Sequence, residues 1–175
     1  MAQNPRPVSP WTTWLLVGAG ALVLGAAFYK DRVVDQTPAP AVSLPKLGGG
    51  TLALQRGKVT VLDFWATWCQ PCRATMPKIQ RMYTEYQPKG VELLSVNTDD
   101  PGNDREIAVS EFLLSNRLTF PVALDDGSAQ SGFKVANLPT LIVVGKDGKV
   151  AWRRIGALND QDERDLRLTL DDAVR

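Results

Sequence analysis

The sequence has no histidine and only two cysteines, Cys69 and Cys72, among its 175 residues. A structural zinc site needs four ligands, nearly always cysteine or histidine, and the chain does not contain them. Covalent attachment of haem requires a histidine directly after the second cysteine, and Arg73 occupies that position. The sequence therefore implies no metal and no organic cofactor.

An excess of charge of one sign is also lacking. The 20 lysine and arginine residues are balanced by 19 aspartate and glutamate residues, which leaves a net charge of +1. Nucleic-acid-binding domains carry a basic excess, so we expect no nucleic-acid partner. The hydrophobic fraction of 44% and the charged fraction of 22% are those of an ordinary globular chain.

One long apolar run is present near the N-terminus. Residues 11–29 (WTTWLLVGAGALVLGAAFY) contain no charged side chain, and tryptophan and tyrosine residues lie at the two ends. As a helix the run would be about 28 Å long, close to the bilayer core of about 30 Å. We expect a transmembrane helix after a short tail, residues 1–10; the alternative is a signal peptide cleaved before Phe28. The lysine and arginine count on the two sides does not assign an orientation.

The rest of the chain divides into a linker and one domain. Residues 30–42 show no apolar period and contain alternating proline and alanine at 38–41, which predicts an extended linker before a domain over 43–175. In the domain, apolar strand-like segments alternate with amphipathic helical ones, which predicts an α/β fold with a mixed sheet flanked by helices. The expected strands are 51–54, 58–66, 91–97, 120–124, 140–145 and 150–156, and the expected helices are 69–87, 105–116, 128–133 and a last one from about 159.

The two cysteines form one closely spaced pair, Cys69-Gln70-Pro71-Cys72, at the junction of an expected strand and an expected helix. A disulfide that closes so short a loop removes little entropy from the unfolded chain, so a purely structural role contributes almost nothing. A Cys-x-x-Cys pair in this setting is typical of a dithiol that cycles with a disulfide. The alternative is that both thiols pack as small hydrophobic side chains.

The segments RGKVTVLDFWATWCQPCRATMP and VANLPTLIVVGKDGKVAWRRIG resemble the membrane-anchored thioredoxin-like proteins of bacteria that include TlpA, ResA and CcmG (DsbE). The resemblance extends from about Val42 to the C-terminus. It implies a thioredoxin fold with an added N-terminal β-hairpin and a central insertion between Asn97 and Pro139. It also implies that the domain lies on the extracytoplasmic side of a bacterial cytoplasmic membrane.

The resemblance assigns roles around the cysteines. Cys69 would be the nucleophile, and its expected place at a helix N-terminus favours the thiolate form. Cys72 would be the buried resolving thiol. Gln70 and Pro71 would tune the redox potential, and Pro71 costs no helical hydrogen bond in the first turn. Trp68 would form a flat exposed surface for substrate; the alternative is that it packs in the core.

Asp63 is expected in a strand that is covered on both faces, where burial of a carboxylate is costly and raises its pKa. The resemblance places it beneath the active site as the group that accepts and returns the proton of the resolving thiol. The alternative is a strand-edge aspartate that reaches water. Many ResA-type relatives carry an acid three residues after the second cysteine, and here that residue is Thr75.

Pro139 resembles the cis proline that faces the cysteine pair in this fold, where it leaves the backbone of Leu138 free to bind an extended substrate segment. The alternative is a trans proline that begins a strand. A cis bond before proline is uncommon in folded proteins. We therefore expect Leu138 and Pro139 to contribute to substrate binding.

These observations predict a membrane-tethered, extracytoplasmic thiol-disulfide oxidoreductase that acts on cysteine-containing proteins. The resemblance implies the reducing direction, apocytochrome c as a candidate partner, and a membrane-embedded reductase as electron donor. An oxidase or isomerase that forms disulfides remains an alternative, as does a tethered peptide-binding module without turnover. A peroxidase is a weaker alternative because its nucleophile normally lies in a different sequence context.

Overall fold

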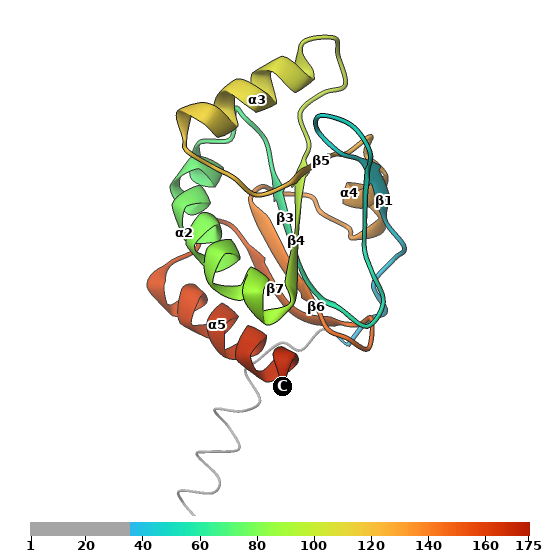
Figure 1. Ribbon diagram of the computed structural model, residues 1–175, viewed down its shortest axis with the longest axis vertical. Coiled ribbons are helices and arrows are strands. Elements are labelled where there is room, and N and C mark those ends of the chain that lie inside the picture. The colour runs from blue at the N-terminus through green and yellow to red at the C-terminus, as the bar shows by residue number, and fades with distance from the viewer. Residues whose placement is uncertain (1–35) are drawn as a thin grey trace, which may run out of the picture. The chain divides into compact units, whose positions relative to one another are not determined.

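The computed structural model describes residues 36–175, which form a five-stranded mixed sheet with helices on both faces and a separate two-stranded hairpin (Figure 1). The strand order in the sheet is β5-β4-β3-β6-β7. The strands are β1 (Ser43–Pro45), β2 (Thr51–Ala53), β3 (Val59–Trp65), β4 (Val91–Asn97), β5 (Val122–Leu124), β6 (Thr140–Val144) and β7 (Val150–Ile155). The helices are α2 (Gln70–Tyr86), the 3-10 turn η1 (Gln87–Lys89), α3 (Arg105–Ser115), α4 (Ser128–Gly132) and α5 (Asp160–Val174).

The centre of the sheet is β3, and all seven of its residues are buried. It runs parallel to β4 and antiparallel to β6, so its residues from Thr60 to Phe64 have a strand on each side. The largely apolar sequence VTVLDFW suits this position because both faces of the strand are covered. The predicted mixed sheet, the added hairpin of β1 and β2, and the flanking helices are confirmed, with strand and helix limits within about two residues of expectation.

Two hydrophobic clusters lie on opposite faces of the sheet. Val61 and Trp65 of β3 belong to the cluster that α2, α3 and α5 cover, and this cluster also contains both cysteines. Leu62 and Phe64, which alternate with them along the strand, belong to the cluster beneath the hairpin and α4 (Figure 1). The face that a β3 side chain occupies therefore decides whether it can reach the cysteines.

The structure places the end of the predicted linker against the domain. The backbone N–H of Val150 donates to the carbonyl of Thr37, and the N–H of Ala39 donates to that of Gly148, each at 2.9 Å. Val42 is buried in the cluster beneath the hairpin. The first two contacts hold Thr37 and Ala39 beside the turn between β6 and β7, so the folded domain includes residues before the expected start at Ser43.

No helix within residues 36–175 is long and apolar enough to cross a membrane. The predicted transmembrane helix, residues 11–29, and the tail before it lie outside the described residues.

Candidate active site

The cysteine pair lies where β3 ends and α2 begins. Cys69 is the N-cap of α2 and Cys72 lies in its first turn; in the structure they form a disulfide with Cα atoms 5.3 Å apart. The Cys69 sulfur accepts a hydrogen bond from the Cys72 N–H at 3.3 Å. Pro71 lies in this turn and has no N–H to leave unpaired. The unsatisfied N–H groups and the positive end of the helix dipole favour negative charge here, so after reduction the site stabilises a thiolate on Cys69.

The surroundings of the two cysteines differ. Cys72 is completely buried, whereas Cys69 retains a small exposed area next to Trp68, whose side chain is 70% exposed. A large aromatic side chain with this exposure presents a flat apolar surface, as binding sites for partner chains commonly do. A partner can therefore reach Cys69 past Trp68, and it cannot reach Cys72 directly. The structure agrees with the predicted exposure of Trp68 and not with its packing in the core.

Asp63 lies in the middle of β3 and is only 1% exposed. Alternation along the strand places its side chain on the same face as Val61 and Trp65, the face that carries both cysteines. Its Oδ2 has no hydrogen-bond partner among the described residues. Burial disfavours the charged carboxylate and raises the pKa of Asp63 to about 7. Near neutral pH this carboxyl can therefore either accept or donate a proton.

Thr75 occupies the position at which many ResA-type relatives carry an acid. Its side chain is buried, and its hydroxyl donates to the carbonyl of Pro71 at 3.2 Å and accepts from the N–H of Leu158 at 3.4 Å. The hydroxyl thus connects the first turn of α2 to the loop before α5. Its hydrogen bonds join elements of the fold, and Asp63 is the buried carboxyl that β3 contributes to this face.

The loop that carries Trp68 is held by residues that sequence reasoning missed. The Thr67 N–H donates to the Asp99 carboxylate at 2.9 Å, and the Thr67 carbonyl accepts from the Arg73 guanidinium at 2.9 Å. The guanidinium also lies over the Phe112 ring, 5.3 Å from its centroid. Asn97 supports Asp99 with a hydrogen bond from its amide at 3.1 Å. These contacts tie the active-site loop to β4 and to α3 of the central insertion.

The sequence offers only a weak signal for these contacts. Two acids, Asp99 and Asp100, follow the end of β4, where loops of parallel sheets commonly carry functional groups. Which of the two reaches Thr67 depends on how β3 and β4 pair, because the bond spans 32 positions along the chain.

The peptide bond between Leu138 and Pro139 is cis, as the resemblance implied. The Pro139 carbonyl accepts a hydrogen bond from the Gly156 N–H at 2.8 Å, which fixes the start of β6 against the end of β7. Leu138 packs against the cluster that contains both cysteines. No backbone hydrogen bond of Leu138 occurs within the described part of the chain, so its N–H and carbonyl can pair with another chain.

Comparisons with known proteins agree with this geometry. The sequence model of the AhpC/TSA family matches residues 36–153. The thiol-disulfide oxidoreductase ResA of one Bacillus cereus strain is 37% identical over 147 residues, which cover 81% of this chain and 83% of that protein. Among solved structures, a putative thiol:disulfide interchange protein DsbE from Chlorobium tepidum is 30% identical with a TM-score of 0.71, covering 81% of this chain and 98% of that one. StoA from Bacillus subtilis is 25% identical with a TM-score of 0.64, covering 77% and 98%.

Proposed function

We propose that this chain, which belongs to the AhpC/TSA family and is a thiol-disulfide oxidoreductase of the ResA/DsbE type, reduces disulfides of partner proteins outside the cytoplasm. The observation that carries the proposal is the arrangement of three groups. Cys69 lies at a helix N-terminus and keeps a small exposed area, and Cys72 is completely buried one turn further on. The buried carboxyl of Asp63, whose Oδ2 has no hydrogen-bond partner among the described residues, occupies the same face of the sheet. This arrangement suits exchange with a second disulfide.

The first step is attack by the Cys69 thiolate on one sulfur of a partner disulfide. A bond forms between Cys69 and that sulfur, the partner disulfide breaks, and the second partner sulfur leaves as a thiolate that takes a proton from water. The helix N-terminus lowers the cost of the attacking charge. Trp68 and the free backbone of Leu138 hold the partner segment while the mixed disulfide exists.

The second step releases the partner. Cys72 gives its proton to the Asp63 carboxylate and attacks the Cys69 sulfur, so that the disulfide of the structure forms and the partner's remaining sulfur leaves. Two electrons have then passed from the cysteine pair to the partner. A pKa of about 7 leaves a substantial share of Asp63 ionised at neutral pH, as a proton acceptor requires. Gln70 and Pro71, between the two cysteines, set the potential of the couple.

The apolar N-terminal run and the resemblance support the proposed cellular setting. Residues 11–29 would anchor the chain in a bacterial cytoplasmic membrane, with the catalytic domain on the extracytoplasmic side. An apocytochrome c with an oxidised Cys-x-x-Cys-His site is the candidate partner. A membrane-embedded reductase would return electrons to the cysteine pair.

The direction of electron flow is tested by the reduction potential of the cysteine couple in residues 36–175, equilibrated with defined thiol buffers. A value of about −270 mV supports a reductant, and a value of about −120 mV would establish an oxidant and refute the proposal. Cys72→Ser is the matched control, because it removes the two-electron couple and keeps the nucleophile.

The role of Asp63 is tested by the rate at which a Cys69 mixed disulfide resolves in Asp63→Asn. We expect resolution to slow by about 100-fold or more near pH 7, because a positioned proton-transfer group typically contributes that much to a rate. A normal rate would contradict the role.

The proposed localisation is tested by a fusion of alkaline phosphatase after Arg175. The fusion is expected to be active and to remain with the membrane fraction; an inactive fusion would place the domain in the cytoplasm.

A further inference from the structure

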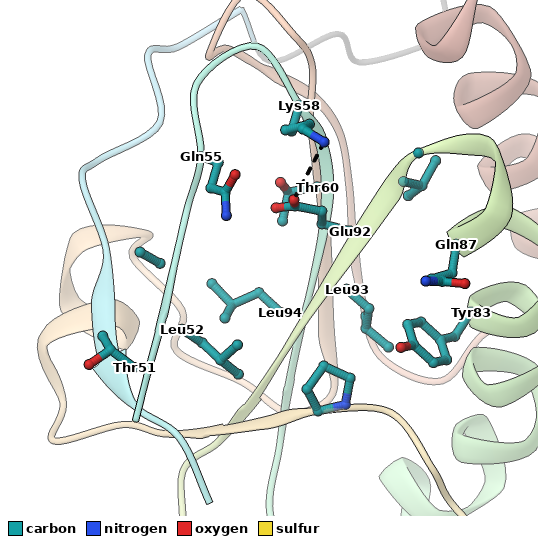
Figure 2. A pocket seen from close by; sticks show the side chains of 14 residues that line it. Thr51, Leu52, Gln55, Lys58, Thr60, Tyr83, Gln87, Glu92, Leu93 and Leu94 are labelled. Atoms are coloured by element: carbon teal, nitrogen blue, oxygen red, sulfur yellow. Dashed lines mark ion pairs between the residues drawn. The ribbon is translucent and has the colours of Figure 1, made fainter. Parts of the chain in front are cut away.

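A hollow with a volume of about 360 Å³ lies along the first half of β4 (Figure 2). β2 and the segment after it form one side, and the end of α2 forms the other. The register pairs Val59 with Val91 at this end of the sheet, and the cysteine pair follows the other end of β3. The seven residues of β4 extend for about 23 Å, so the hollow is well separated from the cysteines.

The floor of the hollow is an unpaired edge of the sheet. β5 pairs only with the last three residues of β4, which leaves residues 91–94 with β3 on one side and the hollow on the other. The Asn97 carbonyl accepts from the Asp125 N–H just beyond β5. Because backbone directions alternate along a strand, Val91 and Leu93 also turn their N–H and carbonyl groups to that side. Within the described part of the chain, none of these groups has a hydrogen-bond partner on that side.

Successive side chains of β4 point alternately to the two faces of the sheet, one on each side of this edge. Leu94 points towards Leu52 of the hairpin, and Leu93 points towards Tyr83 of α2 (Figure 2). All β4 side chains in this half are buried except that of Glu92, which is half-buried. The edge is therefore recessed between two walls. The same edge of a second copy is recessed too, so two copies cannot pair edge to edge without moving those walls.

A buried polar group faces the hairpin side of the hollow. Thr60 is 1% exposed, and its hydroxyl has no hydrogen-bond partner among the described residues. It lines the hollow next to Glu92, its register neighbour in β4. Lys58 lies over them, with its Nζ 4.0 Å from a carboxylate oxygen of Glu92 (Figure 2). An unpaired buried hydroxyl is costly, and a polar group of an occupant would remove that cost.

We propose that this hollow binds an extended segment of a partner polypeptide, which joins the free edge of β4 as an additional strand. Four residues, about 13 Å of extended chain, would fill the edge and pair with Val91 and Leu93. Successive side chains of the bound segment would point alternately to the two faces of the sheet, and an aliphatic side chain on one face would contact Leu93 and Tyr83. On the hairpin face, a long polar side chain such as that of glutamine would reach the Thr60 hydroxyl.

The structure favours this occupant over the chain's own N-terminal segment. Unpaired N–H and carbonyl groups that recur every second residue match the main chain of a polypeptide. This chain enters its domain at Thr37 and Ala39, beside the turn between β6 and β7. The turn joins β6 and β7, and both of these strands lie on the opposite side of β3 from the free edge of β4. The site would give the enzyme a contact with partner chains that does not involve disulfide exchange.

The test uses the full chain in detergent micelles and a capped, fluorescein-labelled nonapeptide of alternating valine and glutamine, which contains no cysteine. We expect saturable binding by fluorescence anisotropy. Hydrogen exchange should slow at the amides of Val91 and Leu93 by about 10-fold or more at saturation, because an added strand pairs with these groups. Slowed exchange only around Pro139, or no binding at millimolar probe, would overturn the proposal.

Backbone methylation of the probe separates strand addition from side-chain binding. One isomer is methylated on its valine nitrogens and the other on its glutamine nitrogens. In a strand only one of these sets faces β4, so one isomer should lose about 10-fold or more in affinity while the other binds nearly as well as the parent. Equal affinity of both isomers and the parent would overturn the proposal, as would β4 protection that rises with protein concentration in the absence of probe.

A matched pair of variants tests the buried hydroxyl. Thr60→Val should weaken probe binding by about threefold to tenfold, and Thr84→Val, which removes an exposed hydroxyl outside the hollow, should leave it unchanged. Both variants should reduce a small disulfide substrate at the wild-type rate, so a failed proposal here is distinguishable from a failed catalytic function. Equal binding by Thr60→Val and wild type would remove the polar side chain from the proposed contact and contradict it.

Discussion

Replacing Asp63 by asparagine should change how stability depends on pH. The folded protein holds the carboxyl with a pKa of about 7, against 3.8 for an unperturbed aspartate, because burial disfavours its charge. Between these two values the folded state keeps a proton that the unfolded state has lost. The free energy of unfolding of the wild type therefore falls as pH rises from about 4 to about 7, and stays level above that range.

The size of the effect follows from the same two values. The interval between 3.8 and about 7, at about 1.4 kcal/mol per pKa unit, corresponds to about 4 kcal/mol. Asparagine has nearly the same shape as a protonated aspartate and does not ionise. Asp63→Asn should therefore be close to the wild type in stability near pH 4 and more stable by about 4 kcal/mol near pH 8.

Urea unfolding of the oxidised fragment 36–175, followed by tryptophan fluorescence between pH 4 and pH 8, measures this difference. Asp125→Asn is the matched control, because Asp125 is equally buried but its two oxygens accept the N–H groups of Ala129 and Gln130 at 2.9 and 3.0 Å. An amide has only one accepting oxygen, so this control should be less stable than wild type by about 1–3 kcal/mol. If Asp63→Asn keeps the same pH dependence as the wild type, the buried carboxyl does not titrate between these two pKa values and the reasoning is refuted.

Three further variants test other parts of the site. Cys72→Ser should accumulate a mixed disulfide with a partner through Cys69, visible on a non-reducing gel; the absence of such a species would contradict the order of attack. Trp68→Ala should raise KM for a protein disulfide severalfold and shift Tm by less than about 2 °C, because the side chain is exposed; a large loss of stability would show that it packs in the core. Thr75→Val should lower the free energy of unfolding by about 1–3 kcal/mol, since it leaves the buried Leu158 N–H without its acceptor; unchanged stability in urea would show that this bond contributes nothing.

Much of the site could be predicted from the sequence because it is local. Cys69 and Cys72 are separated by one helical turn, so a strand-to-helix junction at this point is enough to bring both thiols to the start of α2. The burial of Asp63 followed from the mostly apolar residues around it, since such a segment suits a central strand. In both cases neighbouring residues in the chain determine the environment.

The remaining features depend on which strands become neighbours and on how far each one extends. Asp99 reaches Thr67 because β4 lies parallel beside β3, and nothing near either residue in the sequence specifies that distance. The docking of residues 37–42 depends likewise on the turn between β6 and β7.

The free edge of β4 shows most clearly which features local sequence determines and which ones depend on the tertiary structure. The segment VELLSVN was enough to predict a central strand, because its aliphatic residues fall at both odd and even positions and therefore on both faces of a strand. That β5 covers three of its seven residues, and that the hairpin and α2 form walls along the rest, emerges only in the folded chain. The physical reason is that local sequence sets the conformation of a strand, whereas its hydrogen-bonding partners come from distant segments whose length and register are fixed only when the whole core packs.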